Sequence, residues 1–244
     1  TIHEIDTTKT LNYFHFKDTG YVRLQTSSAV AILDVAPIGP DYLTGHAHAD
    51  TLAFELSISN CRVIVNGGTS IYEDGLIRSK ERGTASHSTV EINGKNSSET
   101  WSSFRVAKRA YPKNLYINKK NTEIFVCCSH NGYERLKGKP IHQRIWKIKE
   151  NSLKIEDKIF GKFDNATARF YLHPEIQVFK VKKNFYLLKT SLKSLTLSVS
   201  VGEAQLQTGF YSPEFGKRFK TKYLVVNFKN TKNTVVEINW GEND

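Results

Sequence analysis

Thr51-Leu-Ala-Phe-Glu-Leu-Ser-Ile-Ser-Asn-Cys-Arg-Val-Ile-Val65 is the stretch of sequence that decides the fold. Apolar side chains recur at every second position of residues 51–58, and residues 62–65 form a second run rich in β-branched side chains. A period of two residues is typical of a strand with one buried face, and the Ser-Asn pair between the runs favours a turn. The stretch therefore predicts two β-strands that follow each other closely along the chain.

Similar short runs are spread over the rest of the chain. They cover residues 21–26, 29–35, 89–92, 123–126, 143–148, 153–157, 168–172, 185–188, 195–201 and 224–228. So many short strands at near-regular spacing predict an all-β fold, an antiparallel sandwich or barrel, and only residues 73–82 form a candidate short helix. The strand pattern continues past a conceivable boundary at residues 161–165, so we expect residues 1–244 to form one domain.

The composition is that of an ordinary globular protein. The 244 residues are 39% hydrophobic and 24% charged, enough to bury a core, and no apolar stretch approaches the roughly 20 residues of a membrane-spanning helix. The chain contains no methionine, so we expect a processed protein or a piece of a longer chain. Cys61, Cys127 and Cys128 do not form a disulfide framework, and we expect free thiols.

The net charge of +11 points to an acidic partner: a nucleic acid, an anionic membrane surface or an anionic polysaccharide. The basic residues are spread along the chain, and no nucleic-acid-binding signature accompanies them, so we expect no nucleic acid partner. A solvated, lysine-rich surface explains the charge equally well, and charge alone does not name the partner.

Polar side chains are densest in Gly45-His46-Ala47-His48-Ala49-Asp50, directly before residues 51–58. If the strand pattern extends back through this motif, His46, His48 and Asp50 share the apolar face of the strand. Buried polar groups need partners, so these side chains are hydrogen-bonded, bound to a metal, or exposed at the mouth of a cleft. A single histidine in such a place is more often a satisfied core residue, but two at alternate positions beside a carboxylate favour a ligand site.

Two more polar residues complete the candidate site. Asn66 precedes Gly67-Gly68, and His87 lies in Gly83-Thr-Ala-Ser-His-Ser-Thr89, although a turn and a surface loop explain them equally well. Cationic side chains surround them in the sequence: Arg78, Arg82, Arg105, Lys108 and Arg109. Cations beside a histidine pair suit a substrate that carries carboxylate or sulfate groups, and a solvated face is the alternative.

The order of these motifs resembles the β-domain of heparinase II/III-type polysaccharide lyases. The resemblance rests on Gly-His-Ala-His-Ala-Asp at 45–50, Asn-Gly-Gly-Thr-Ser-Ile-Tyr at 66–72, Arg78, Arg82, Ala-Ser-His-Ser-Thr at 85–89, and the run from Asn93 through Trp101 to Phe104, Arg105 and Arg109. It continues through His130-Asn-Gly-Tyr-Glu-Arg-Leu136, the run with His142 and Arg144, and Phe170-Tyr-Leu-His-Pro174. The resemblance therefore covers residues 20–175 in ordered blocks.

The resemblance implies a large antiparallel β-sandwich, a supersandwich, that follows a helical toroid absent from this chain, with the active site in the cleft between the two. His46 resembles the catalytic histidine of the family, and His48 and His87 resemble its zinc ligands. The third family ligand is an aspartate, and Asn66 stands at its position here. A neutral amide is a poorer zinc ligand than a carboxylate, so zinc affinity is expected to fall unless Asp50 substitutes. The expected role of the zinc is structural, orienting His46.

The resemblance also implies a reaction. Lyases of this type cleave uronic-acid-containing anionic polysaccharides by β-elimination, and a histidine working with a tyrosine suits the proton transfers. The local tyrosines are Tyr72 and Tyr133, and the candidates for binding substrate are Arg78, Arg82, Arg105 and Tyr72. The partner tyrosine of the family belongs to the helical domain, so we expect the isolated chain to have little or no activity. A bacterial origin and a periplasmic or cell-envelope location fit the family.

Other functions fit parts of the pattern. A non-catalytic carbohydrate-binding domain, in a protein that makes or processes a surface polysaccharide, is the strongest alternative. A cupin-type oxygenase would also be all-β with a His-x-His strand, but Glu55 lies too far downstream and no matching second motif follows.

Overall fold

A computed structural model of the chain describes residues 11–228 and 231–241, and these residues form an almost entirely β structure. The strands belong to three main sheets and one short hairpin, and every pair of named strands is antiparallel. No helix in this part of the chain is long and apolar enough to cross a membrane. The predicted all-β, antiparallel fold is confirmed.

The first layer of the fold joins two sheets. Five strands follow in sequential order: β1 (Asn12–Phe16), β2 (Tyr21–Gln25), β3 (Ala29–Asp34), β4 (Phe54–Ile58) and β5 (Cys61–Ile64). Four more are ordered β17 (Glu203–Tyr211), β18 (Phe219–Asn227), β13 (Ala166–Tyr171) and β6 (Val90–Ile92). A bridge between Ile64 and Leu172 links β5 to the end of β13, so the two sheets continue one another.

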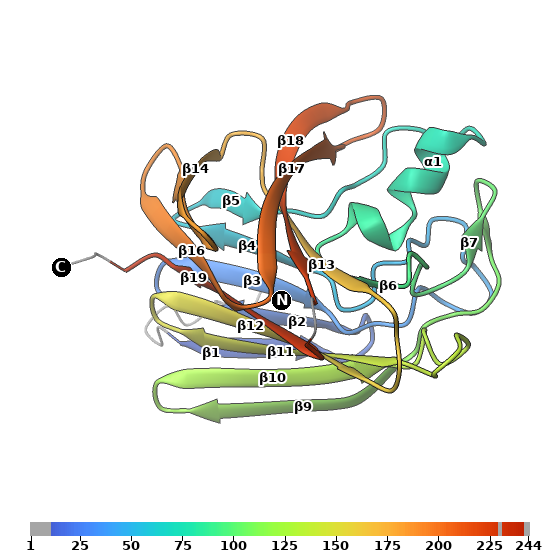
Figure 1. Cartoon of the computed structure of the whole chain (residues 1–244), viewed down its shortest axis with the longest axis horizontal. Coiled ribbons are helices and arrows are strands. Elements are labelled where there is room, and N and C mark those ends of the chain that lie inside the picture. The colour runs from blue at the N-terminus through green and yellow to red at the C-terminus, as the bar shows by residue number, and fades with distance from the viewer. Residues whose placement is uncertain (1–10, 229–230, 242–244) are drawn as a thin grey trace, which may run out of the picture.

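The second layer is one eight-stranded sheet. Its order is β14 (Gln177–Lys182), β15 (Phe185–Lys189), β16 (Ser194–Val201), β19 (Asn233–Asn239), β12 (Ser152–Phe160), β11 (Ile141–Lys149), β10 (Glu123–His130) and β9 (Pro112–Lys120). Figure 1 shows β1–β5 stacked over β9–β12, with β17 and β18 rising across them.

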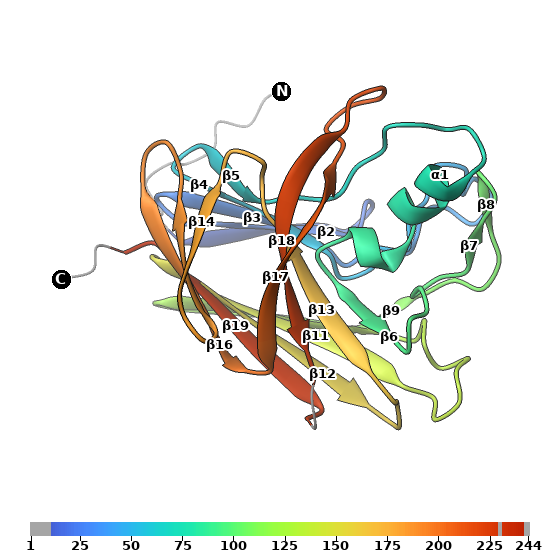
Figure 2. The same ribbon diagram turned by 45° about the horizontal axis from the view of Figure 1, so that its top comes forward.

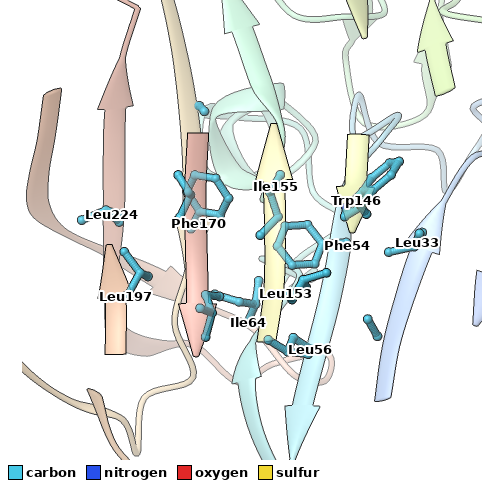
Figure 3. Packing of buried hydrophobic residues seen from close by; sticks show 14 of the residues in the cluster. Leu33, Phe54, Leu56, Ile64, Trp146, Leu153, Ile155, Phe170, Leu197 and Leu224 are labelled. Carbon is cyan, nitrogen blue, oxygen red and sulfur yellow. The ribbon is translucent and has the colours of Figure 1, made fainter. Parts of the chain in front are cut away.

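The core fills the space between the layers. Strand β3 buries every second residue, and β12 does the same from the other side, as the two-residue period of the sequence predicts. Figure 3 shows Phe54 of the first layer packed near Leu153 and Ile155 of the second. One cluster of buried residues runs from Leu11 to Trp240, so the core extends across the conceivable boundary at residues 161–165.

The segment with the two histidines differs from its prediction. Strand β4 begins only at Phe54, and residues 45–53 form turns and bends. Leu52 has a φ of 65°, a left-handed conformation outside the range of regular strands, yet its side chain is fully buried. His46, His48 and Asp50 therefore do not share a strand face with Phe54, and the prediction that they do is wrong. Burial of Leu52 compensates for this strained backbone.

The remaining short elements gather beside this segment at one end of the sandwich. They are α1 (Leu76–Glu81), the 3-10 turn η1 (Thr84–Ser86), β7 (Thr100–Trp101) and β8 (Arg105–Val106). Figures 1 and 2 show α1, β7 and β8 together at this end. The helix confirms the expectation for residues 73–82.

A buried ion pair holds the first layer to the second behind this end. Arg144 on β11 donates from Nε and Nη2 to the two carboxylate oxygens of Asp157 on β12, at 2.7 and 2.9 Å. Its Nη1 crosses to the first layer and donates to the carbonyls of Leu52, at 2.8 Å, and Ser88, at 2.5 Å. Arg144 and Asp157 are almost completely buried. One guanidinium therefore fixes the backbone next to both histidine-bearing segments.

Candidate functional site

A hollow of about 590 Å³ opens at this end of the sandwich, and the predicted motif lines it. His46, His48 and Asp50 come from the loop before β4, and Asn66 comes from the end of β5. His87 lies behind them, with its ring centroid 5.1 Å from that of His48. The structure thus brings together the residues that the sequence placed in one site, from three separate segments.

His46 is the exposed histidine of the group. Its ring meets the ring of Tyr72 edge to face at 5.3 Å between centroids and the ring of Phe104 at 6.4 Å. Tyr72 in turn stacks on Phe215 at 5.0 Å. These aromatic contacts hold the imidazole at the mouth of the hollow, and its ring nitrogens stay accessible to a bound molecule.

His48 lies deeper and is held by two donors. Its Nε2 is 3.0 Å from Thr69 Oγ1 and 3.3 Å from Nη1 of Arg78. Burial, helped by the charges of His87 and Arg78, lowers the pKa of His48 to about 2. The imidazole is therefore neutral at all ordinary pH values, and Nε2 accepts the hydrogen bond from the guanidinium.

His87 is fully buried and ends a chain of hydrogen bonds. Its Nδ1 lies 2.7 Å from Oδ1 of Asn66, and Nδ2 of Asn66 donates to Oδ2 of Asp50 at 3.2 Å. Burial lowers the pKa of His87 against the opposing charge of Asp50, so the ring is neutral. Because Oδ1 of Asn66 can only accept a hydrogen bond, Nδ1 is the protonated nitrogen and donates to it. Nε2 of His87 is buried with no hydrogen-bond partner among the described residues.

As they are arranged, the side chains of His48, Asn66 and His87 do not form a zinc-binding site. Two neutral imidazoles lie close together, and the free Nε2 of His87 suits a metal, but Oδ1 of Asn66 already accepts a hydrogen bond from His87. The guanidinium of Arg78 occupies Nε2 of His48. Over residues 11–228 and 231–241, no group of three His, Cys, Asp or Glu side chains is placed to hold a metal ion. The described residues, as they are arranged, therefore do not fit a zinc ion.

Two of the predicted substrate-binding arginines, Arg82 and Arg78, are buried and not exposed to the hollow. Arg82 is fully buried and donates to the carbonyls of Ala47, at 3.0 Å, and Ser102, at 2.8 Å. Arg78 is 1% exposed, and besides His48 its Nε donates to the carbonyl of Ser103 at 3.1 Å. Neither guanidinium is open to a substrate in this structure, which corrects the prediction. Both arginines tie the site loop to the β7–β8 hairpin.

Of the other predicted residues, Arg105 and Tyr72 are exposed and Tyr133 is buried. Arg105 is exposed and stacks over the ring of Trp101 at 4.7 Å, and Tyr72 is 38% exposed, so both remain available to a ligand. Tyr133 is fully buried, and its hydroxyl donates to the carbonyl of Val90 at 2.7 Å. It is a structural residue of the core.

Sequence reasoning missed the acidic wall of the hollow. Tyr21 and Asp34 lie at the ends of β2 and β3 and line it together with Asp50. Burial and the neighbouring carboxylate of Asp50 raise the pKa of Asp34 well above its ordinary value, and Asp34 in turn raises the pKa of Tyr21 to about 12. A strand-terminal Asp or Tyr carries no signal of its own, because only the fold brings it beside the motif.

Fold and site define the class of this protein: an all-β, supersandwich domain with histidines and carboxylates gathered at one end of two layers. The family described as heparinase II/III-like, C-terminal, matches residues 8–240, and the chain belongs to that family. No match was found among curated proteins.

Solved structures show the same fold. The heparan sulfate lyase HepC from Pedobacter heparinus superposes with a TM-score of 0.76 at 17% identity, covering 95% of this chain and 37% of that chain. A heparinase III gives 0.77 at 17% identity, covering 97% and 37%. YeaD from Salmonella typhimurium, a proposed mutarotase, gives 0.52 at 7% identity, covering 96% and 97%. The chain thus spans little more than a third of the lyases it resembles.

Proposed function

We propose that this chain is the β-sandwich part of a polysaccharide lyase that cleaves a uronic-acid-containing polysaccharide by β-elimination, with His46 as a catalytic residue. The observation that carries the proposal is the contrast between the histidines. His46 is exposed at the mouth of the hollow and held by Tyr72 and Phe104, whereas His48 and His87 are turned inward and hydrogen-bonded.

The reaction needs one proton to leave and another to arrive. A base removes the proton at C5 of the uronate, the electron pair forms the C4–C5 double bond, the C4–O bond breaks, and an acid protonates the departing oxygen. Histidine exchanges protons near neutral pH, so an exposed imidazole suits either transfer. His46 has room to reach a bound sugar because its ring packs against aromatic carbon only, and it is not engaged by a neighbouring acid.

The neighbouring residues would bind and orient. Tyr72 contacts His46, and Arg105 is the exposed neighbour in sequence of Phe104, which also contacts His46, so the two would offer a hydroxyl and a cation to an anionic sugar. Arg78 and Arg82 act indirectly, because their hydrogen bonds fix the loops that carry these groups. The acid or base that works with His46, together with a group that neutralises the substrate carboxylate, would come from a helical toroid in the longer parent chain, in a periplasmic or cell-envelope setting.

The test uses the parent chain and a panel of uronate-containing polysaccharides. Ultraviolet absorbance of unsaturated product ends should rise with one polymer, and His46→Ala should abolish the rise. His15→Ala is the matched control, because His15 lies on the edge strand β1 and does not line the hollow, and it should leave the rate unchanged. A parent chain that makes product equally well with His46→Ala would refute the proposed role of His46.

A non-catalytic saccharide-binding role is the second candidate. The likeness to YeaD covers almost all of both chains, so this fold also exists as a complete protein. Saccharide binding that survives His46→Ala, without unsaturated products from the parent chain on any polymer, would favour this role.

A further inference from the structure

A second hollow, of about 540 Å³, lies on the other side of the segment that follows β5. Gly67 lines it, whereas the neighbouring Asn66 and Gly68 line the His46 hollow, so one stretch of backbone separates the two. Its other walls are α1 and the β17–β18 hairpin, which Figure 2 shows beside each other. None of the residues proposed for the lyase reaction lines this second hollow.

Aromatic rings form one wall of this second hollow. Tyr171 and Tyr223 stack with centroids 4.6 Å apart and an interplanar angle of 11°. Phe210, which follows Gly209 on β17, also lines the hollow and is 42% exposed. Flat apolar rings with polar edges suit the mixed surface of a sugar ring, which has C–H groups on its faces and hydroxyls around its edge.

Cations line the same hollow. Lys80 on α1 is exposed, and Arg218 lies over the ring of Phe210 with Cζ 3.6 Å from the centroid. Neither forms an ion pair with any residue in 11–228 or 231–241. Arg169 binds Glu91 through Nη2 at 2.9 Å, while its Nη1 is buried with no partner in the described residues. Glu81 is the single acid of the lining, and its carboxylate is turned to Ser70.

The absence of a side chain at Gly209 lets the two tyrosine rings pack directly on strand β17. Gly209 lies in the middle of β17 and faces the stacked tyrosines: a Cβ there would lie 3.0 Å from Tyr223 and 3.1 Å from Tyr171. Glycine weakens a strand, and in that position it often marks a place where another group approaches closely. An unpartnered buried donor, free cations and aromatic rings that rest on a glycine together describe a site for an anionic ring.

We propose that the hollow between α1 and the β17–β18 hairpin binds an acidic sugar unit of the polysaccharide, as a second saccharide site beside the His46 hollow. The sugar ring packs on Phe210 and the tyrosine wall, and its carboxylate or sulfate meets Arg218, Lys80 and the free Nη1 of Arg169. The ligand class rests on the proposed lyase function, but the binding itself requires neither His46 nor a helical toroid.

The test is calorimetric titration of the 244-residue chain at about 0.1 M salt, where long-range attraction is largely screened. The probes are a heparin tetrasaccharide, a hyaluronan tetrasaccharide that bears carboxylates only, and neutral cellotetraose. Lys80→Glu with Arg218→Glu should weaken binding of the acidic probes by at least about tenfold. The control pair, Lys180→Glu with Lys182→Glu on the far edge strand β14, changes the net charge equally and should weaken it less than about threefold.

Gly209→Val displaces the rings of Tyr171 and Tyr223 without changing charge, and it should also remove binding if the variant melts like the wild type. Preference for heparin over hyaluronan assigns the anion as sulfate, and equal affinity assigns it as carboxylate. Equal losses in the two charge-reversed pairs, or cellotetraose binding as tightly as the acidic probes, would overturn the second site. The lyase assay on the parent chain is read separately, so either proposal can fail while the other stands.

Discussion

Replacing Arg144 by methionine tests whether the ion pair behind the site supports the whole sandwich. The change removes the cation from a carboxylate that is 1% exposed, and it removes the donor from the carbonyls of Leu52 and Ser88. Breaking a buried pair on one side costs about 3–5 kcal/mol, and each buried carbonyl left without its donor adds about 1–3 kcal/mol. Because these losses overlap, we expect a total of about 5 kcal/mol.

Such a loss is large beside the stability of a typical domain, about 5–15 kcal/mol. A chain of this length loses about 2–4 °C in melting temperature for each kcal/mol, so Arg144→Met should melt about 10–20 °C below the wild type. Differential scanning calorimetry of the chain measures this. Lys217→Met is the control, because Lys217 and Glu214 are 56% and 61% exposed and such a pair contributes at most about 1 kcal/mol.

A second variant separates charge from packing. Arg144→Met together with Asp157→Leu removes both charges, and we expect it to recover part of the lost melting temperature, since no buried carboxylate is left unpaired. If Arg144→Met melts within about 3 °C of the wild type, the argument that this guanidinium fixes the two layers is refuted.

Three further predictions follow from the site and its supports. Burial alone would raise the pKa of Asp157, but Arg144 and His142 lower it to about 2, below the ordinary value of 3.8. The ionised carboxylate therefore stabilises the fold above about pH 4, and this contribution is lost as the pH falls towards 2. The contribution is about 2 kcal/mol, and thermal melts between pH 5 and 2 should show a shallower decline for Asp157→Asn than for the wild type. Asn66→Asp should raise zinc affinity about tenfold or more in metal titrations, because a carboxylate replaces an amide. A wild-type chain that already binds stoichiometric zinc, with an affinity that this variant does not change, would contradict the expectation. Tyr72→Ala should lower the lyase rate of the parent chain by about tenfold or more, since both the ring that orients His46 and the hydroxyl are lost. Tyr72→Phe loses only the hydroxyl and should lower the rate less, and equal rates in the two variants would show that the ring contact is dispensable.

The strands that the sequence predicted well are those with one buried face. β3 buries every second side chain, which is the alternation visible in its sequence. β14 was missed because nearly all of its residues are exposed, and it forms only because β15 offers backbone partners. Pairing with a neighbour, which a single run of residues does not reveal, decides such edge strands.

The sequence predicted which residues form the site, but not how their segments are arranged. His46, His48, Asn66 and His87 do meet, since their motifs follow a known order. What the sequence could not show is that Leu52 reverses the chain before β4, because a positive φ at leucine has no sequence signature. The partners of the buried arginines were equally hidden, since they are backbone carbonyls, which every residue possesses.

The outer strands of the eight-stranded sheet have a consequence for self-association. A strand at the end of a sheet exposes unpaired backbone groups that another chain can extend into a fibre. The strand at one end, β9, carries Lys113, Lys119 and Lys120, and the strand at the other, β14, carries Lys180 and Lys182. Two copies approaching edge to edge would bring ammonium groups together, so charge repulsion opposes sheet extension, and replacing these lysines by threonine would make the domain prone to aggregate.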